Sequence, residues 1–113
     1  MPRIDNAFFG SIIIDGKKYD TDVLVASDGE VVKREKSHIF TKQELMDLLM
    51  MKEPEVIIIG TGMAGYVKVH PDAEVFAKLN GIELLAMPTG KAVLEFNRRS
   101  KKGKVVAVIH VTD

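Results

Sequence analysis

The first half of the chain alternates short apolar runs with turn residues, a pattern typical of antiparallel strands joined by hairpins. Asp15-Gly16 suits the positive φ angles of a two-residue hairpin turn, and Ser27-Asp28-Gly29 marks a second reversal. The extended segments predicted around these turns are 11–14 with 17–20, and 23–26 with 30–34. We therefore expect the chain to open with two antiparallel β-hairpins.

A helix is predicted between Thr41 and Pro54. Thr41 and Glu44 have the spacing of a capping box, in which the threonine oxygen accepts from the Glu44 amide and the Glu44 side chain reaches back. Apolar residues then recur at helical spacing, at Leu45, Leu48 and Leu49. The proline ends this pattern, since it cannot continue a helix.

The second half alternates strands with amphipathic helices. Strands are predicted at 56–59, 82–87 and 105–111, and the last is apolar throughout, so it should be covered on both faces. The first helix of this half should begin at Pro71 and present an apolar face made by Val75, Phe76 and Leu79. Asn80-Gly81 supplies its stop.

The second helix of this half should be capped by Thr89, carry Val93, Leu94 and Phe96, and end at 101–103. The order is β-α-β-α-β, for which right-handed crossovers are expected. No repeat or linker divides the chain. We therefore predict one three-layer α/β domain over residues 1–113, with a mixed sheet from this C-terminal βαβαβ unit plus the N-terminal antiparallel hairpins.

Three glycines directly after the strand at 56–59 match the G-x-G-x-x-G spacing of dinucleotide-binding folds: Gly60, Gly62 and Gly65. A nucleotide site would need a helix to begin at these glycines, yet residues 66–69 favour a strand. The expected acidic residue about 20 positions further on is also missing. We interpret the glycines as residues that let the backbone turn sharply, and we expect no cofactor.

The sequence is also compatible with a different kind of anion-binding site. If the three C-terminal strands are parallel, their carboxyl ends meet at one edge, where open α/β sheets usually bind ligands. Free amides at the start of the second helix and one lysine could hold a phosphate or carboxylate there. This hypothesis assigns the anion to Gly60, Thr61, Gly62, Thr89, Gly90, Lys91 and His110. The alternative is a capped helix start with an exposed lysine.

The amino-acid composition excludes several classes of function. Sixteen basic and sixteen acidic residues cancel, so no overall field favours nucleic acid or an anionic membrane, and 46% hydrophobic residues suffice for a core. No cysteine is present, which excludes disulfides and thiolate chemistry. The sequence opens without a basic-then-apolar leader and holds no apolar run near about 20 residues. We expect a soluble, cytoplasmic protein without membrane insertion.

The remaining polar residues show no catalytic grouping. No metal site is predicted, because the spacing of His38, His70 and His110 is not that of metal ligands. His110 is either a packing residue or a catalytic base that faces the carboxyl edge of the sheet. Asp22 is interpreted as a strand-end residue, and Arg34 could pair with Glu35 at the surface. The basic run 98–104 is interpreted as a solvated helix end rather than a nucleic-acid patch.

Several short patterns in fixed order resemble a known family over nearly the whole chain. They are Gly10-x-Ile12-x-Ile14-x-Gly16-x-x-Tyr19, Arg34-Glu35-x-x-His38, Ile59-Gly60-x-Gly62-Met63 running into Val67-Lys68-Val69, Leu79-x-x-Gly81-Ile82, Thr89-x-x-Ala92-Val93-x-x-Phe96-Asn97 and His110-x-Thr112. The family comprises small prokaryotic proteins of unknown function, the adipogenesis-associated protein of animals and a mitochondrial assembly factor of respiratory complex I. The chain departs from it in lacking a tryptophan before Arg34, in Phe96 for tyrosine, and in Asp113 for a common cysteine.

The resemblance implies a compact α/β fold of mixed sheet plus a hairpin layer, and no established reaction. We expect a non-catalytic protein-binding or assembly module with an unidentified protein partner, as a monomer or weak homodimer. The alternative is a binder of a small anionic ligand, or an enzyme, that uses the edge of the sheet. A contiguous exposed apolar surface favours the first, and converging polar groups favour the second.

Overall fold

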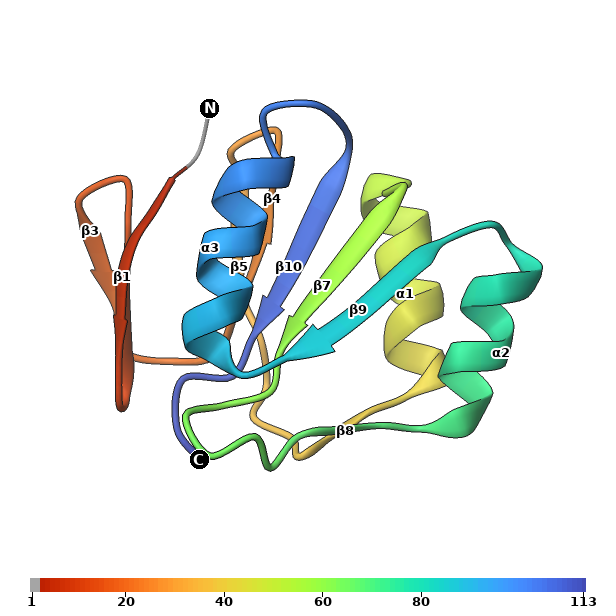
Figure 1. Ribbon diagram of the computed structural model, residues 1–113, viewed down its shortest axis with the longest axis horizontal. Helices are drawn as coiled ribbons and strands as arrows, with labels where there is room; N and C mark the ends of the chain where they lie inside the picture. The colour runs from red at the N-terminus through yellow and green to blue at the C-terminus, as the bar shows by residue number, and fades with distance from the viewer. Residues whose placement is uncertain (1–2) are drawn as a thin grey trace.

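The computed structural model describes residues 3–113, and its central feature is a five-stranded mixed sheet (Figure 1). The helices are α1 (Lys42–Lys52), α2 (Pro71–Leu79) and α3 (Thr89–Arg99). The strands are β1 (Ile4–Phe8), β2 (Ser11–Ile14), β3 (Lys17–Tyr19), β4 (Val23–Ala26), β5 (Val31–Lys33), β6 (Ile39–Phe40), β7 (Val56–Gly60), β8 (Lys68–Val69), β9 (Glu83–Met87) and β10 (Val105–Ile109).

The main sheet has the order β5-β4-β10-β7-β9. β7 pairs in parallel with both β9 and β10, while β4 pairs with β10 and β5 in antiparallel fashion. Every residue of β10 is buried, because helices cover both faces of the sheet at its centre. The predicted parallel β-α-β-α-β unit and the doubly covered last strand are therefore confirmed.

Two apolar cores flank the sheet, so the three-layer α/β prediction is confirmed. α1 and α2 lie side by side on one face, and α3 lies on the other with the small sheet β1-β2-β3 beside it (Figure 1). One core joins α3 and the small sheet to the main sheet, and the second joins α1 and α2 to it. The strand β1 was not predicted, and it pairs with β2 through a register irregularity between Ile4 and Asn6.

The start of α1 follows the capping-box prediction only in part. The Glu44 amide donates to the Thr41 hydroxyl at 3.1 Å, as predicted. The Glu44 side chain does not reach back, because both of its oxygens accept hydrogen bonds from Arg34. An ion pair with a buried guanidinium is stronger than a bond to one exposed amide, and this explains the difference.

The predicted apolar face of α2, made by Val75, Phe76 and Leu79, is confirmed only at Phe76, which packs against the core. The helix begins at Pro71 as expected, but Ala73 and Ala77 face the core, while Val75 and Leu79 are 57% and 80% exposed. Two alanines let the helix backbone approach the sheet closely, and Val75 and Leu79 then lie on the outer side. Sequence periodicity cannot distinguish such a helix from one with its bulky side inward.

The start of α3 also differs from the prediction. Thr89 is the first helical residue rather than the cap, and Pro88 precedes it without a side-chain cap bond. The Thr89 side chain is fully buried, and its hydroxyl forms hydrogen bonds with the segments that follow β7 and β10. Val93 and Phe96 are buried as predicted, whereas Leu94 is exposed. Within residues 3–113, no helix has both the length and the apolar character needed to cross a bilayer.

Candidate functional site

The carboxyl ends of β7, β9 and β10 meet at one edge of the sheet, as the sequence predicted (Figure 1). The chain leaves β7 toward α2 on one face and leaves β9 toward α3 on the other, which makes this a topological switch point. Three segments close the edge: 60–65 at the end of β7, 88–91 after β9 and 110–113 after β10.

The glycines of the G-x-G-x-x-G segment each have a local structural role. A Cβ on Gly60 would lie 3.0 Å from the Thr89 hydroxyl, so this glycine permits close packing of strand and helix. Gly62 has φ +106°, and a Cβ there would lie 2.5 Å from the Asp113 carbonyl carbon and 2.8 Å from Cδ2 of His110. Gly65 has φ +74° and makes a turn. In dinucleotide-binding folds, such glycines let the pyrophosphate approach the backbone closely. Here the groups that approach the glycines closely are Thr89, His110 and Asp113 of the same chain.

Hydrogen bonds within the chain occupy most amides of this edge. The Thr89 amide donates to the Gly62 carbonyl at 3.2 Å, and the Gly62 amide donates to the Thr89 hydroxyl at 2.9 Å. That hydroxyl donates in turn to the His110 carbonyl at 2.7 Å. Thr61 and Lys91 also direct their amides to carbonyls, of Met87 and Pro88. The free Thr89 amide that the anion hypothesis assumed is therefore not present.

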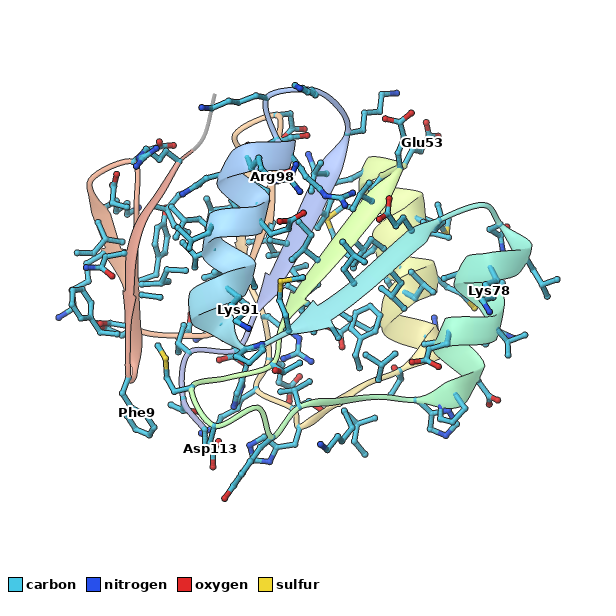
Figure 2. All side chains as sticks on the ribbon, in the orientation of Figure 1. Phe9, Glu53, Lys78, Lys91, Arg98 and Asp113 are labelled. Atoms are coloured by element: carbon cyan, nitrogen blue, oxygen red, sulfur yellow. The ribbon has the colours of Figure 1, made fainter. Side chains whose placement is uncertain are left out.

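The fold brings together only part of the residues assigned to the anion. Gly60, Thr61, Gly62, Thr89 and the His110 backbone lie in contact through these bonds. Gly90 and Lys91 lie on the exposed side of the first turn of α3, and Figure 2 shows Lys91 there, with Asp113 beyond the strand ends.

The His110 side chain, by contrast, is the inner member of a buried polar cluster. It is 1% exposed, and its Nδ1 lies 2.7 Å from Oδ2 of Asp22. The other oxygen of Asp22 accepts from the Val111 amide at 2.9 Å, and Oδ2 also accepts from Arg34 Nη1 at 3.1 Å. Asp22 therefore holds the position of the imidazole and pairs with a buried guanidinium at the same time.

Arg34 continues this cluster to the first turn of α1. Its Nε and Nη2 donate to the two oxygens of Glu44 at 2.6 and 3.1 Å, a bidentate pair, and Nη1 also donates to the Ser37 carbonyl at 3.3 Å. Each charge is thus paired and hydrogen-bonded, as burial requires. The predicted pairing of Arg34 with Glu35 is wrong, since the ion pairs of Arg34 are with Asp22 and Glu44.

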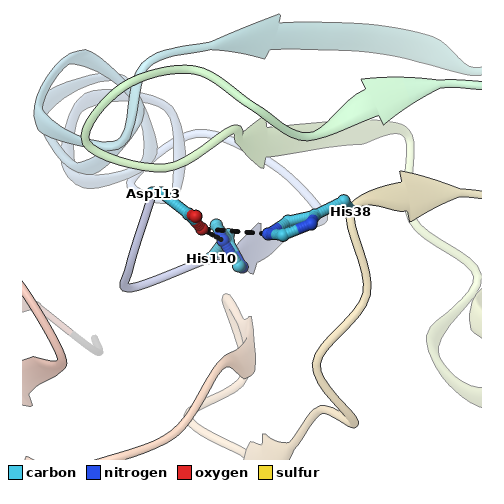
Figure 3. Close-up of side chains that lie close together, drawn as sticks. All are labelled: His38, His110 and Asp113. Atoms are coloured by element: carbon cyan, nitrogen blue, oxygen red, sulfur yellow. Dashed lines mark hydrogen bonds and ion pairs between the residues drawn. The ribbon is translucent and has the colours of Figure 1, made fainter.

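The outer side of His110 faces Asp113 and His38 (Figure 3). Asp113 Oδ1 lies 3.2 Å from His110 Nε2 and 2.9 Å from His38 Nε2, and the two rings meet edge to face with centroids 5.1 Å apart. The Thr112 hydroxyl lies 3.1 Å from His110 Nε2. Hydrogen bonds from His110 and then His38 lower the pKa of Asp113 from 3.8 to about 2.

Sequence reasoning missed this cluster because its members are far apart in the chain. Asp22 and His110 are 88 positions apart, and His38 and Asp113 are 75 apart. The signal that could have found it is the pair of charged residues, Asp22 and Arg34, beside strands that the sequence predicts as buried. His70 lies apart, as the exposed cap of α2. Arg98 and Arg99 of the basic run pair with Glu95, as a solvated helix end does.

Solved structures support the fold. A conserved hypothetical protein of Pyrococcus horikoshii is 26% identical with a TM-score of 0.87, over 98% of this chain and 99% of its own. A structure described as MT938 is 29% identical with a TM-score of 0.82, and the match covers 100% of both chains. A Bordetella pertussis protein described as an Mth938-like domain, 17% identical over 96% of this chain and 85% of its own, shares the fold with a TM-score of 0.77.

The descriptions of these structures assign no reaction, ligand or partner. The model of a family described as proteins of unknown function, DUF498/DUF598, matches residues 4–110, and the chain therefore belongs to this family.

Proposed function

We propose that this chain is a non-catalytic protein-binding or assembly module that docks another protein on the outer side of α1 and α2. The observation that carries the proposal is a set of exposed apolar side chains on these two helices, Met46, Met50, Val75 and Leu79. All four side chains are exposed, and Met50 is 88% exposed. Isolated exposed apolar residues are ordinary, whereas a group on adjoining elements marks a contact surface.

Helical geometry supports the grouping of these side chains. Met46 and Met50 are four positions apart on α1, and Val75 and Leu79 are four positions apart on α2, so each pair shares one side of its helix. Lys42 Nζ lies 5.2 Å from the centroid of the Phe76 ring, so α1 and α2 adjoin at these two residues. Methionine is adaptable and is common at protein-binding surfaces.

The family resemblance supports a role in assembly, because one of its branches is a complex I assembly factor and another is the adipogenesis-associated protein. We extend from that resemblance only the class of activity, association with another protein. We also propose a cytoplasmic location for the complex, which cell fractionation tests.

A matched pair of variants tests the proposal. Met50→Ser with Leu79→Ser removes the two most exposed of these side chains, while Leu94→Ser removes an exposed leucine from α3 on the opposite face. A stoichiometric partner is to be identified from native lysate and purified, and its Kd measured for each variant. We expect the double variant to bind at least about tenfold more weakly, which corresponds to about 1.4 kcal/mol, and Leu94→Ser to bind normally.

Two results would overturn the proposal. One is a partner that binds the double variant as tightly as the unmodified chain. The other is a concentration-dependent dimer in sedimentation that the double variant loses, which would make a second copy of the chain the occupant.

The second candidate function is binding of a small anionic ligand, or catalysis, at the carboxyl edge. The convergence of His38, His110 and Asp113 favours it, because polar side chains from separate elements meet there at the surface. Lys91 on the first turn of α3 would add positive charge. An amide NMR titration with phosphates, nucleotides and carboxylates tests it through the Gly60, Gly62 and Gly90 signals.

A further inference from the structure

We propose that His38, His110 and Asp113 bind a divalent transition-metal cation, with Zn²⁺ as the type case. The three ligand atoms are Nε2 of each histidine and Oδ1 of the aspartate, and all lie within 4.8 Å of one another. Two imidazole nitrogens and one carboxylate oxygen form a donor set that suits Zn²⁺, Fe²⁺, Co²⁺ or Ni²⁺. Mg²⁺ and Ca²⁺ prefer oxygen ligands alone.

The two distances from the Asp113 oxygen to the histidine nitrogens fit such a cation. Atoms bound at about 2.0–2.2 Å from one metal ion lie roughly 2.9–3.4 Å apart at octahedral or tetrahedral angles. Asp113 Oδ1 lies 2.9 Å from His38 Nε2 and 3.2 Å from His110 Nε2, within that range. The two rings stand at 79° to each other and present their Nε2 atoms to the same oxygen (Figure 3).

A second observation, independent of these distances, is the buried partner of His110. Metal-binding histidines almost always direct their other ring nitrogen to a carboxylate, a carbonyl or water, and this fixes the tautomer that leaves a lone pair for the metal. Here Asp22 Oδ2 lies 2.7 Å from Nδ1 of His110, and Arg34 together with the Val111 amide holds the carboxylate in place. Because Asp22 holds Nδ1, Nε2 beside Asp113 is the ring nitrogen that can bind the metal once it carries no proton.

The inner ligand is rigid and the outer ligands are accessible. His110 is buried, while the side chains of His38 and Asp113 are 48% and 41% exposed, so a cation can enter and the two outer ligands can adjust. Three protein ligands with one side open to solvent are typical of sites that keep a position for water or another exchangeable ligand. The cation takes the place of the hydrogen bonds that Nε2 makes with the Thr112 hydroxyl and with Asp113 Oδ1.

The untagged, chelator-treated full chain is to be titrated with Zn²⁺ by calorimetry and with Co²⁺ by visible absorption. We expect one equivalent to bind, with Co²⁺ d–d bands and imidazole NMR shifts at His38 and His110. His38→Ala and Asp113→Asn change exposed side chains and should fold normally. Each should weaken the affinity at least tenfold, whereas His70→Ala, which removes an exposed histidine outside the cluster, should leave it unchanged.

Asp22→Asn tests the role of the buried partner, because loss of such a partner lowers metal affinity by about 10–100-fold; circular dichroism shows whether this variant folds. The proposal is overturned if the unmodified chain binds neither metal, or if His38→Ala and Asp113→Asn bind as tightly as His70→Ala. Mg²⁺ in excess should not compete. The inference does not rest on the protein-binding proposal, since the surface variants on α1 and α2 should bind the metal normally.

Discussion

Replacement of Gly62 by alanine tests the packing of the carboxyl edge most directly. The backbone at Gly62 has φ +106°, a conformation that side chains disfavour. A Cβ there would lie 2.5 Å from the carbonyl carbon of Asp113 and 2.8 Å from its oxygen, which accepts hydrogen bonds from the Ala64 and Tyr66 amides. Residues 110–113 must therefore move for the variant to fold.

The magnitude follows from two terms. Backbone strain of this kind contributes about 1–3 kcal/mol. Displacement of 110–113 weakens the bonds that the amides of Met63, Ala64 and Tyr66 donate to the carbonyls of Thr112 and Asp113, each with a net value of about 1 kcal/mol. We expect Gly62→Ala to lower the free energy of unfolding by about 3–5 kcal/mol, which is a large share of the stability of a typical small domain.

Gly65→Ala is the matched control in the same segment. Gly65 also has a positive φ, +74°, but a Cβ there would lie 3.7 Å from the Thr61 hydroxyl, its nearest neighbour, which is an ordinary contact. Strain alone should lower stability by about 1–2 kcal/mol. Urea unfolding followed by circular dichroism measures both variants. If Gly62→Ala destabilises the chain no more than Gly65→Ala does, the argument from close approach is refuted.

Three further changes probe other parts of the molecule. Asp22→Ala leaves Arg34 and His110 without their buried partner and should cost about 3–5 kcal/mol in urea unfolding; a loss below about 1 kcal/mol would contradict this. Gly90→Ala should raise the melting temperature, with a gain of up to about 1 kcal/mol, because the helix has open space there. The carboxyl carbon of Asp113 should titrate in NMR with a pKa of about 2. Since this folded pKa lies below the ordinary 3.8, the carboxylate stabilises the fold above about pH 4, and that contribution is lost as the pH falls through 2. Asp113→Asn should abolish this part of the acid dependence.

The architecture could be predicted from the sequence wherever local patterns decide it. The hairpin turn at Asp15-Gly16, the cap at Thr41 and the start of α2 at Pro71 each depend on neighbouring residues only, and each is observed. The parallel arrangement of β7, β9 and β10 followed from the alternation of strands and helices, because a βαβ unit leaves few topologies.

The errors arise where a long-range contact outweighs a local preference. Threonine is a common helix-capping residue, but the Thr89 hydroxyl accepts a hydrogen bond from the Gly62 amide and donates one to the His110 carbonyl. These partners are 27 and 21 positions away. Leu79 has the spacing of a core residue, but the alanines of α2 approach the sheet and leave it outside. No window of neighbouring residues contains the information that decides either case.

The candidate site also depends on contacts between residues far apart in the chain, and these contacts give the glycine motif a different interpretation. A glycine motif indicates that something approaches the backbone closely, but it does not state what approaches. At Gly62 the approaching group is the chain's own segment 110–113, so the missing Cβ makes room for Asp113 and for the ring of His110. That segment carries two of the three side chains that converge at the edge of the sheet. The motif therefore does mark the candidate site, because its glycines make room for the side chains that converge there.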